Sequence, residues 1–208
     1  MRIVFLLGLV PSLAFADVPT IAIGPWIGTA PLTPKSSTEL LSESETGDGG
    51  HGMTGGMLSM ITERGSVVLA SDFLFGVGDT SGEVTGAPPL SGGKSASYTG
   101  TVYDSRFQTR VGLRAPLGRF ELAAGVGIGV DVWFAVNNLG NQPGALFSPN
   151  GSAIDAYAPL WTALTVKPSC DLGVQLYAQY DVHPFTSENI ATFGVNLVVQ
   201  SRRCLHSS

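Results

Sequence analysis

The sequence predicts an all-β protein, an eight-stranded antiparallel up-and-down transmembrane β-barrel, and three observations support this prediction. Residues 120–136 alternate without a break, with an apolar side chain at every even-numbered position. Several such extended stretches are separated by connections that are alternately very short and very long. The chain also begins with a short apolar segment that has the features of a secretory leader. Together these features are typical of a barrel in a bacterial outer membrane.

The leader is the apolar run that lies between Arg2 and an Ala-Phe-Ala cleavage signal. We expect residues 1–16 to be removed as a signal peptide and residues 17–204 to form an outer-membrane β-barrel. Residues 205–208 would then be a short periplasmic tail. No Cys stands at the cleavage point, which argues against a lipoprotein anchor.

The composition limits the other classes of protein. The mean hydropathy is +0.25, which is high for a chain with 27 Gly and 13 Pro. No run of residues reaches the roughly 18 consecutive apolar side chains that a spanning helix needs. Once the leader is removed, 10 basic residues face 16 acidic ones, giving a net charge of −6. That charge argues against nucleic acid as a partner.

Eight extended segments are expected, joined by short turns on the periplasmic side and longer loops outside. The segments are 18–28, 51–62, 65–78, 98–115, 118–136, 153–167, 170–183 and 189–202. The predicted tight turns are Glu63-Arg64, Pro116-Leu117 and Pro168-Ser169. The long loops, rich in Gly, Ser, Pro and Asn, are 29–50, 79–97 and 137–152.

The first two segments are the weakest of the eight. Pro19 and Pro25 interrupt the first, and Gly52, Gly55 and Gly56 dilute the second. Both residue types are poor occupants of a central strand. The expected count of eight strands therefore depends on these two segments.

The remaining six segments have one apolar face and one face that carries charge. In the fourth segment Tyr103, Phe107, Val111 and Leu113 oppose Asp104, Arg106, Gln108, Arg110 and Arg114. The other charged positions are Asp72, Arg119, Glu121, Asp131, Asp155, Lys167, Asp171, Asp181 and Arg202. The apolar faces would carry an outer aromatic belt of Phe75, Tyr103, Phe134, Tyr180 and Phe193.

These charges are expected to line the lumen. The interior of an eight-stranded barrel is just wide enough for side chains to fill it, and unpaired charge in so narrow a space is costly. We therefore expect an internal salt-bridge network and a plugged barrel, in preference to a basic anion track along Arg106, Arg110, Arg114 and Arg119. The predicted network is Asp104, Arg106, Arg110, Arg114, Arg119, Glu121, Asp131, Asp155, Lys167, Asp171, Asp181 and Arg202.

The two cysteines are expected to meet at the periplasmic rim. In a final hairpin centred near Ser187, paired positions sum to about 374, which would place Cys170 opposite Cys204. A disulfide can form in that compartment. Two unpaired thiols, or a metal site lacking further ligands, are the alternatives.

With this pattern the chain resembles the small eight-stranded bacterial outer-membrane proteins, such as the OmpA transmembrane domain and the OmpX-like barrels. The resemblance covers nearly all of residues 17–204 and rests on pattern. It implies export to the outer membrane and contact with outer-membrane lipid. One departure is the C-terminus, where residues 202–208 follow the last strand and Phe193 is the nearest preceding aromatic residue, whereas such barrels usually end on an aromatic residue.

Two groups of residues are candidates for chemistry. Gly125, Gly127 and Gly129 lack the spacing of a phosphate-binding loop and fit better as small lumen-facing residues. His183, Ser187 and Glu188 at the last outer loop could activate a serine for acyl transfer, as in some outer-membrane lipid A deacylases.

A cation site at His51, beside Asp48, is less favoured than a solvated acidic loop. No cofactor and no metal site are expected. The sequence therefore offers only weak candidates for catalysis.

The leading hypothesis is a non-enzymatic outer-membrane barrel with a structural or surface-interaction role. Its loops 29–50, 79–97 and 137–152 would bind an extracellular protein or a cell-surface partner, because outer loops on a rigid frame usually carry recognition. A lipid-modifying barrel enzyme is the first alternative. The second is a soluble secreted β-barrel, whose apolar faces would pack inward.

Overall fold

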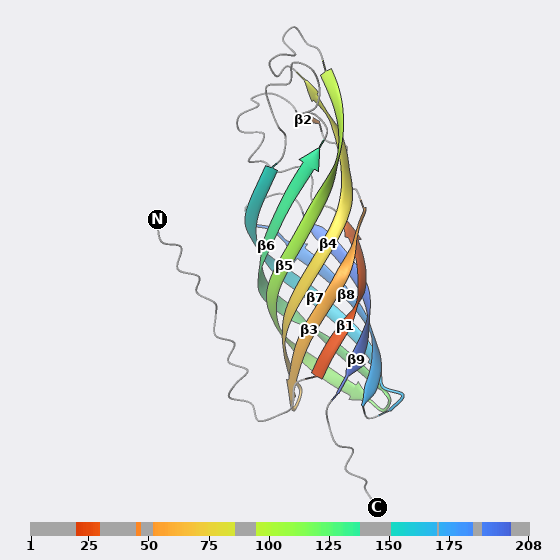
Figure 1. Ribbon diagram of the computed structural model, residues 1–208. Helices are drawn as coiled ribbons and strands as arrows, with labels where there is room; N and C mark the ends of the chain where they lie inside the picture. The colour runs from red at the N-terminus through yellow and green to blue at the C-terminus, as the bar shows by residue number, and fades with distance from the viewer. Residues whose placement is uncertain are drawn as a thin grey trace, which may run out of the picture.

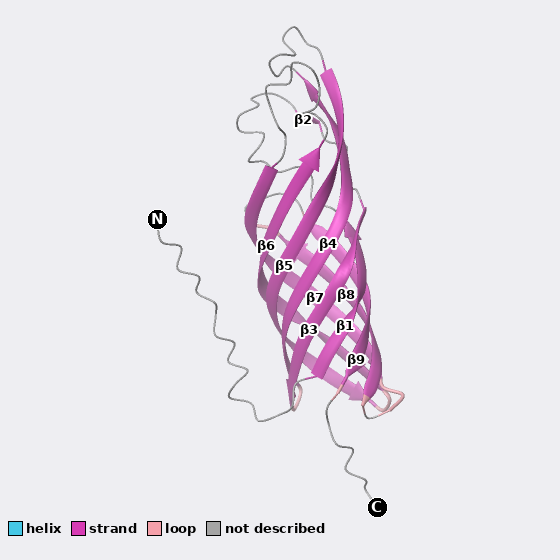
Figure 2. Ribbon diagram, in the orientation of Figure 1, coloured by secondary structure: helices cyan, strands magenta, loops and turns pink. Residues whose placement is uncertain are grey.

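The computed structural model describes residues 20–29, 45–46, 52–85, 95–137, 151–169, 171–184 and 189–200. Eight long strands form a closed barrel (Figures 1 and 2). They are β1 (Thr20–Thr29), β3 (Gly52–Arg64), β4 (Val67–Thr85), β5 (Ser95–Leu117), β6 (Phe120–Asn137), β7 (Gly151–Val166), β8 (Leu172–Val182) and β9 (Ile190–Val199). The short β2 (Glu45–Thr46) pairs with the far end of β4. Among the described residues, no helix has the length and hydropathy needed to cross a membrane.

The ring is antiparallel throughout. Each long strand pairs with the next long strand along the chain, and β1 closes the ring by pairing with β9. Pairing between β1 and β9 gives each of these two strands a neighbour on both sides, so the barrel lacks the open edges of a flat sheet. The predicted up-and-down barrel of eight strands is therefore confirmed, including its two weakest segments.

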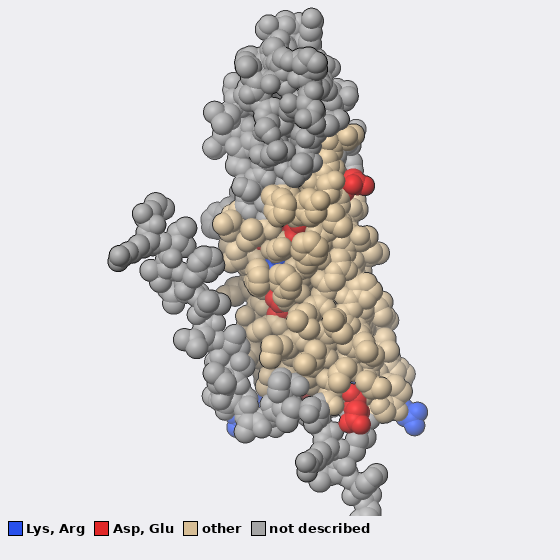
Figure 3. Space-filling view, in the orientation of Figure 1, with Lys and Arg blue, Asp and Glu red and all other residues tan. Residues whose placement is uncertain are grey.

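The wall is apolar outside and polar inside. Ile128 and Leu160 are among the many large apolar side chains exposed on the exterior, whereas Arg106 and Asp181 are fully buried in the lumen. Figure 3 shows one side of this exterior, with charged side chains sparse between its two ends. A water-soluble barrel would bury its apolar face, so this arrangement is that of a transmembrane barrel. Of the predicted aromatic belt, Phe75, Phe134, Tyr180 and Phe193 are exposed and Tyr103 is half-buried, stacked on Phe134.

Two of the tight turns lie two residues later than predicted. Gly65-Ser66 and Gly118-Arg119 are two-residue loops whose glycines have φ of +57° and +67°. Left-handed φ at the first loop position suits a hairpin, and glycine adopts it without strain. The predicted turn Glu63-Arg64 is wrong, because both residues still belong to β3 and pair with β4. The predicted turn Pro116-Leu117 is wrong for the same reason, because both residues belong to β5 and pair with β6. We call this end of the barrel the turn end.

The register of the last hairpin also differs from the prediction. Paired positions of β8 and β9 sum to 371, as in Tyr177 opposite Gly194, and not to 374. The argument that placed Cys170 opposite Cys204 is therefore wrong by three residues. Both cysteines lie outside the described residues, so their disulfide stays a prediction.

Two prolines occur inside strands, each at an interruption of a ladder. The β1–β9 ladder passes from Ile23 to Trp26 and skips Gly24 and Pro25. The β6–β7 ladder similarly skips the two rungs that include Pro159. Proline has no N–H to donate, so each interruption falls where the backbone lacks a donor.

At the opposite end, which we call the loop end, β4 and β5 continue past the wall. They stay paired as far as Thr85 and Ser95, whereas β3 follows β4 only to Gly78 and β6 follows β5 only to Gly100. The resulting two-stranded ribbon projects beyond the barrel (Figure 1). β2 pairs with its β4 edge at Val84 and Glu83.

Candidate functional site

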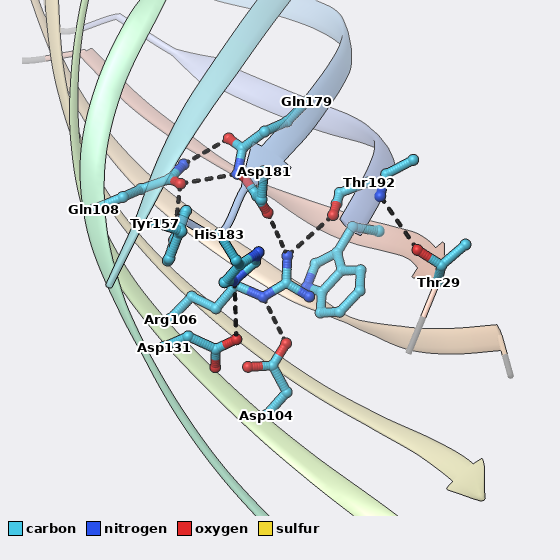
Figure 4. Close-up of polar contacts among 12 residues, drawn as sticks. Thr29, Asp104, Arg106, Gln108, Asp131, Tyr157, Gln179, Asp181, His183 and Thr192 are labelled. Atoms are coloured by element: carbon cyan, nitrogen blue, oxygen red, sulfur yellow. Dashed lines mark hydrogen bonds and ion pairs between the residues drawn. The ribbon is translucent and has the colours of Figure 1, made fainter. Parts of the chain in front are cut away.

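The lumen holds three layers of polar side chains, and the loop-end cluster is built around Arg106. Its guanidinium donates from Nε to Asp104 Oδ2 at 2.6 Å and from Nη1 to Asp181 Oδ2 at 2.9 Å (Figure 4). Nη1 also donates to Thr192 Oγ1 at 3.1 Å. The Trp26 ring lies 5.1 Å from the guanidinium carbon, a cation–π distance. Arg106 therefore joins β1, β5, β8 and β9 across the barrel.

His183 and Asp131 complete the loop-end cluster. His183 lies one residue beyond the end of β8, and its Nε2 is 3.7 Å from Asp131 Oδ2 (Figure 4). The Tyr157 ring packs against the imidazole with 5.3 Å between ring centroids. His183, Asp131 and Tyr157 are all buried, so this imidazole faces the lumen and its carboxylates.

The middle cluster is built around Asp72 and Arg110. Arg110 donates from Nε to Asp72 Oδ2 at 2.5 Å and from Nη2 to Asp72 Oδ1 at 2.8 Å, the two-pronged geometry that makes such pairs strong. Its guanidinium stacks on Trp161 at 4.6 Å and on Tyr177 at 5.0 Å. Gln108 donates to Asp72 Oδ2 at 2.8 Å, so one carboxylate serves several donors.

Glutamine amides connect the middle cluster to the loop-end cluster. Gln108 donates to Gln179 Oε1 at 2.8 Å and receives a hydrogen bond from Gln179 Nε2 at 2.9 Å. Gln179 Nε2 also donates to Asp181 Oδ1 at 2.5 Å, and Tyr157 donates its hydroxyl to Gln108 Oε1 at 3.0 Å. These hydrogen bonds join the two clusters into one network of buried polar groups, which extends over much of the length of the lumen.

The turn-end cluster shares two carboxylates between two cations. Arg114 Nη1 donates to Glu63 and, at 3.0 Å, to Glu121 Oε2. Lys167 Nζ donates to the same Glu121 oxygen at 2.8 Å. Arg114 and Lys167 are half-buried, so solvent screens this cluster more than the other two.

Bulky side chains fill the remaining lumen against glycines. A Cβ added to Gly129 would lie 2.4 Å from the Tyr157 ring, and one added to Gly76 would lie 2.4 Å from the Trp26 ring. The expectation that Gly125, Gly127 and Gly129 are small residues making room for bulky neighbours is confirmed at Gly129. A Cβ added to Gly125 or Gly127 would first meet a backbone carbonyl oxygen of β5, that of Val111 or of Thr109. A lumen cavity near the turn end has a volume of about 20 Å³, room for one water molecule.

Most of the predicted network residues meet in these clusters, two do not, and one is not described. The lumen contains Asp104, Arg106, Arg110, Arg114, Glu121, Asp131, Lys167 and Asp181, with Asp155 half-buried opposite Asp131. Placing Arg119 in the lumen is wrong because it occupies the exposed turn after Gly118. Asp171 is likewise exposed, between β7 and β8. Arg202 lies outside the described residues, as do Ser187 and Glu188.

Several contributors were missed by reading charges alone. The sequence predicts Glu63 in a turn, and the predicted network does not include the uncharged members Trp26, Gln108, Tyr157 and Gln179. Their signal was the same alternation, since each shares the lumen face of its strand with a charged or buried neighbour. Among the described residues, no group of three or more His, Cys, Asp or Glu is placed to hold a metal ion.

Comparison with solved structures shows the class of fold. The crystal structure of Ail, the attachment invasion locus protein of Yersinia pestis, matches with a TM-score of 0.51 and 11% identity, covering 89% of this chain and 99% of Ail. Neisserial surface protein A, NspA, matches with a TM-score of 0.53 and 6% identity, covering 88% of this chain and 96% of NspA. No protein-family model matches the chain, and no curated protein matches it.

The chain thus has the fold of the small eight-stranded outer-membrane β-barrels, as the resemblance predicted. At these levels of identity the likeness establishes the fold, and function has to be argued from the lumen and the loop end.

Proposed function

We propose that this chain is a non-enzymatic barrel of the bacterial outer membrane that binds a surface partner through its loop end. Residues 1–16 would direct export, the turn end would face the periplasm, and the loop end would face outward. The supporting observation is the combination of a filled lumen with a β4–β5 ribbon that projects beyond the wall. Because ion pairs occupy the interior of this barrel, we expect binding to take place on the loops and strand ends at its outer end.

The ribbon has the properties of an interaction element. Within the described residues, the ladder of Ser95 to Tyr98 runs only to β4, so the other side of this stretch has no partner strand among them. Such an edge can bind an extended segment of another protein by strand addition. The structure describes only part of each predicted loop, 29–50, 79–97 and 137–152. The role of these loops in binding stays a proposal.

The solved relatives favour this function over catalysis. Another crystal structure of Ail, with a TM-score of 0.50, 12% identity and coverage of 87% of this chain and 96% of Ail, contains the heparin analogue sucrose octasulfate. For the acyl-transfer alternative, a general base would have to reach an outer-leaflet lipid. His183 instead lies buried against Asp131 and Tyr157 inside the barrel. This placement argues against a lipid-modifying enzyme based on His183.

The test removes the ribbon and keeps the barrel. In the variant, an Asn-Gly turn replaces residues 81–99 and joins Thr80 to Gly100, which are opposite each other in the β4–β5 ladder. Bacteria producing the wild type or the variant are tested for adhesion to surfaces coated with sulfated polysaccharide or with extracellular-matrix protein. We expect the wild type to increase adhesion on one of these surfaces and the variant to abolish the increase.

The control for folding is the gel mobility of each protein with and without heating, because a folded membrane barrel resists the gel detergent until heated. Wild-type cells that adhere no better than cells without the protein would contradict the proposal. A folded, ribbon-less variant that still adheres fully would contradict the role of the ribbon.

A further inference from the structure

The loop-end cluster differs from the other two clusters in its charge balance. The middle cluster pairs Asp72 with Arg110, and the turn-end cluster pairs two carboxylates with two cations. Around Arg106, by contrast, the buried lumen residues that carry an ordinary charge are three carboxylates and one guanidinium. The carboxylates are Asp104, Asp131 and Asp181. Buried negative charge without compensation is strongly unfavourable, so this end of the lumen favours the uptake of a proton or another cation.

The cluster also contains buried polar atoms that have no hydrogen-bond partner among the described residues. They are Asp104 Oδ1, Asp131 Oδ1, Arg106 Nη2 and both ring nitrogens of His183. Asp131, Asp104 and His183 are each more than nine-tenths buried. The carboxylate of Asp131 and the imidazole of His183 therefore lie close together with unused capacity to share a proton.

We propose that His183 holds this missing charge as a bound proton, so that an imidazolium ion shared with Asp131 sits in the lumen and the barrel loses stability as the pH rises. A proton needs no additional space. An inorganic ion would need a ligand set, and none of three or more His, Cys, Asp or Glu exists among the described residues. Imidazole is also the side chain whose ordinary pKa lies nearest to neutrality.

The carboxylates that face His183 from the neighbouring elements favour its charged form, whereas the guanidinium of Arg106 opposes it. β5 contributes Asp104 with its partner Arg106, β6 contributes Asp131, β7 contributes Asp155 and Tyr157, and β8 contributes Asp181. Trp26 of β1 and Thr192 of β9 do not ionise.

Burial opposes charging of the imidazole, but attraction to the nearby carboxylate of Asp131, with Asp181 and Asp155 adding, outweighs it. The pKa of His183 is therefore raised above its ordinary value. The direction for stability follows from proton linkage. A raised pKa means that the folded barrel holds a proton that the unfolded chain releases near its ordinary value. The stabilisation is fully present below that ordinary value and is lost as the pH rises through the pKa of the folded state.

The test is a titration of the folded full-length mature protein in detergent micelles, followed by the side-chain nitrogen resonances of its histidines. The spectrum of His183→Gln assigns the His183 signals among the three histidines of the chain. A free imidazole with an ordinary pKa of about 6.5 is about one-tenth protonated at pH 7.5. We expect His183 to keep a larger protonated fraction than this, whereas titration at or below the ordinary value would overturn the proposal.

Two variants and one metal ion make the result specific. Asp131→Asn should lower the protonated fraction of His183, whereas Asp79→Asn, which removes an exposed carboxylate near the same end, should leave it unchanged. Equal effects of the two variants would contradict a local site. Calcium chloride should have no more effect than sodium chloride of equal ionic strength. If calcium displaces the proton at constant pH, the cluster is an inorganic cation site and the proposal is wrong.

Urea unfolding of the wild type provides a second measurement. Its unfolding midpoint should fall as the pH is raised above the ordinary imidazole range, and the fall should be smaller in His183→Gln. A His183→Gln barrel with the same pH dependence as the wild type would show that other groups are responsible and would contradict the proposal.

Discussion

Arg106 of β5 and Asp181 of β8 form an ion pair across the lumen, with 2.9 Å between Nη1 and Oδ2, although they are 75 residues apart in the chain. Both side chains are fully buried. The pair connects opposite parts of the wall directly through the interior, in addition to the strand-to-strand ladder. Its energetic role can be separated from that of the ladder by substitution.

Replacing Arg106 by Met is expected to destabilise the barrel by about 3–5 kcal/mol, because it leaves Asp104 and Asp181 buried without their cation. The measurement is urea unfolding in lipid vesicles, followed by tryptophan fluorescence. Arg119→Met is the matched control, since Arg119 is exposed in a turn, and its effect should stay within about 0.5 kcal/mol. Similar losses for both variants would show that the effect comes from net charge and not from the buried pair.

Gly55 and Gly56 provide a matched pair for close packing in the lumen. A Cβ on Gly55 would lie 2.0 Å from the Phe75 carbonyl oxygen and 2.7 Å from the Trp26 indole, whereas a Cβ on Gly56 would meet nothing within 4 Å. We therefore expect Gly55→Ala to cost about 1–3 kcal/mol by overpacking. Gly56→Ala should be neutral or slightly stabilising. If the two variants unfold at the same urea concentration, Trp26 is not held as described.

The lipid-facing wall can be tested by the depth dependence of an arginine. Ile128 is 75% exposed within the apolar exterior. Leu117 is 64% exposed at the end of β5, next to the Gly118-Arg119 turn. Ile128→Arg is expected to cost about 2–4 kcal/mol in vesicles, and Leu117→Arg about 0–1 kcal/mol. The unfolding midpoints of the two variants measure this difference. An Ile128→Arg barrel as stable as the wild type would contradict a membrane-spanning exterior at that position.

Arg110→Lys tests whether geometry matters beyond charge in the middle cluster. Lysine keeps the positive charge but cannot form the two parallel bonds to Asp72 or stack as a plane on Trp161. We expect a loss of about 1–3 kcal/mol in the same unfolding assay. Arg114→Lys, in the half-buried turn-end cluster, should lose less. A larger loss for Arg114→Lys would reverse this ranking of the two clusters.

The fold was predictable because alternation is a local property of the chain. Lipid outside and a polar lumen inside impose the same two-residue period on every strand, so strands as weak as β1 could be placed despite Pro25. The predicted turns Glu63-Arg64 and Pro116-Leu117 lie two residues too early, because the strands continue through both pairs of residues. The informative residues were Gly65 and Gly118, whose positive φ suits a two-residue hairpin.

The partners within the lumen were less predictable than its members. A face that carries Arg106 identifies a lumen residue, but its bond to Asp181 depends on how β5 and β8 stand across the barrel, which no local pattern reports. Register between β8 and β9 depends on the geometry of the loop between them, and an error of three residues there undermined the argument for pairing Cys170 with Cys204. Uncharged members such as Gln108 gave no charge signal.

The two ladder interruptions at Pro25 and Pro159 divide the ring into unequal panels. One panel contains β1, β3, β4, β5 and β6, and the other contains β7, β8 and β9. Because backbone pairing is interrupted at the two seams between these panels, we expect the wall to bend more easily there. Under lateral pressure from the bilayer, the circular cross-section would then flatten by hinging along two lines and not by uniform deformation.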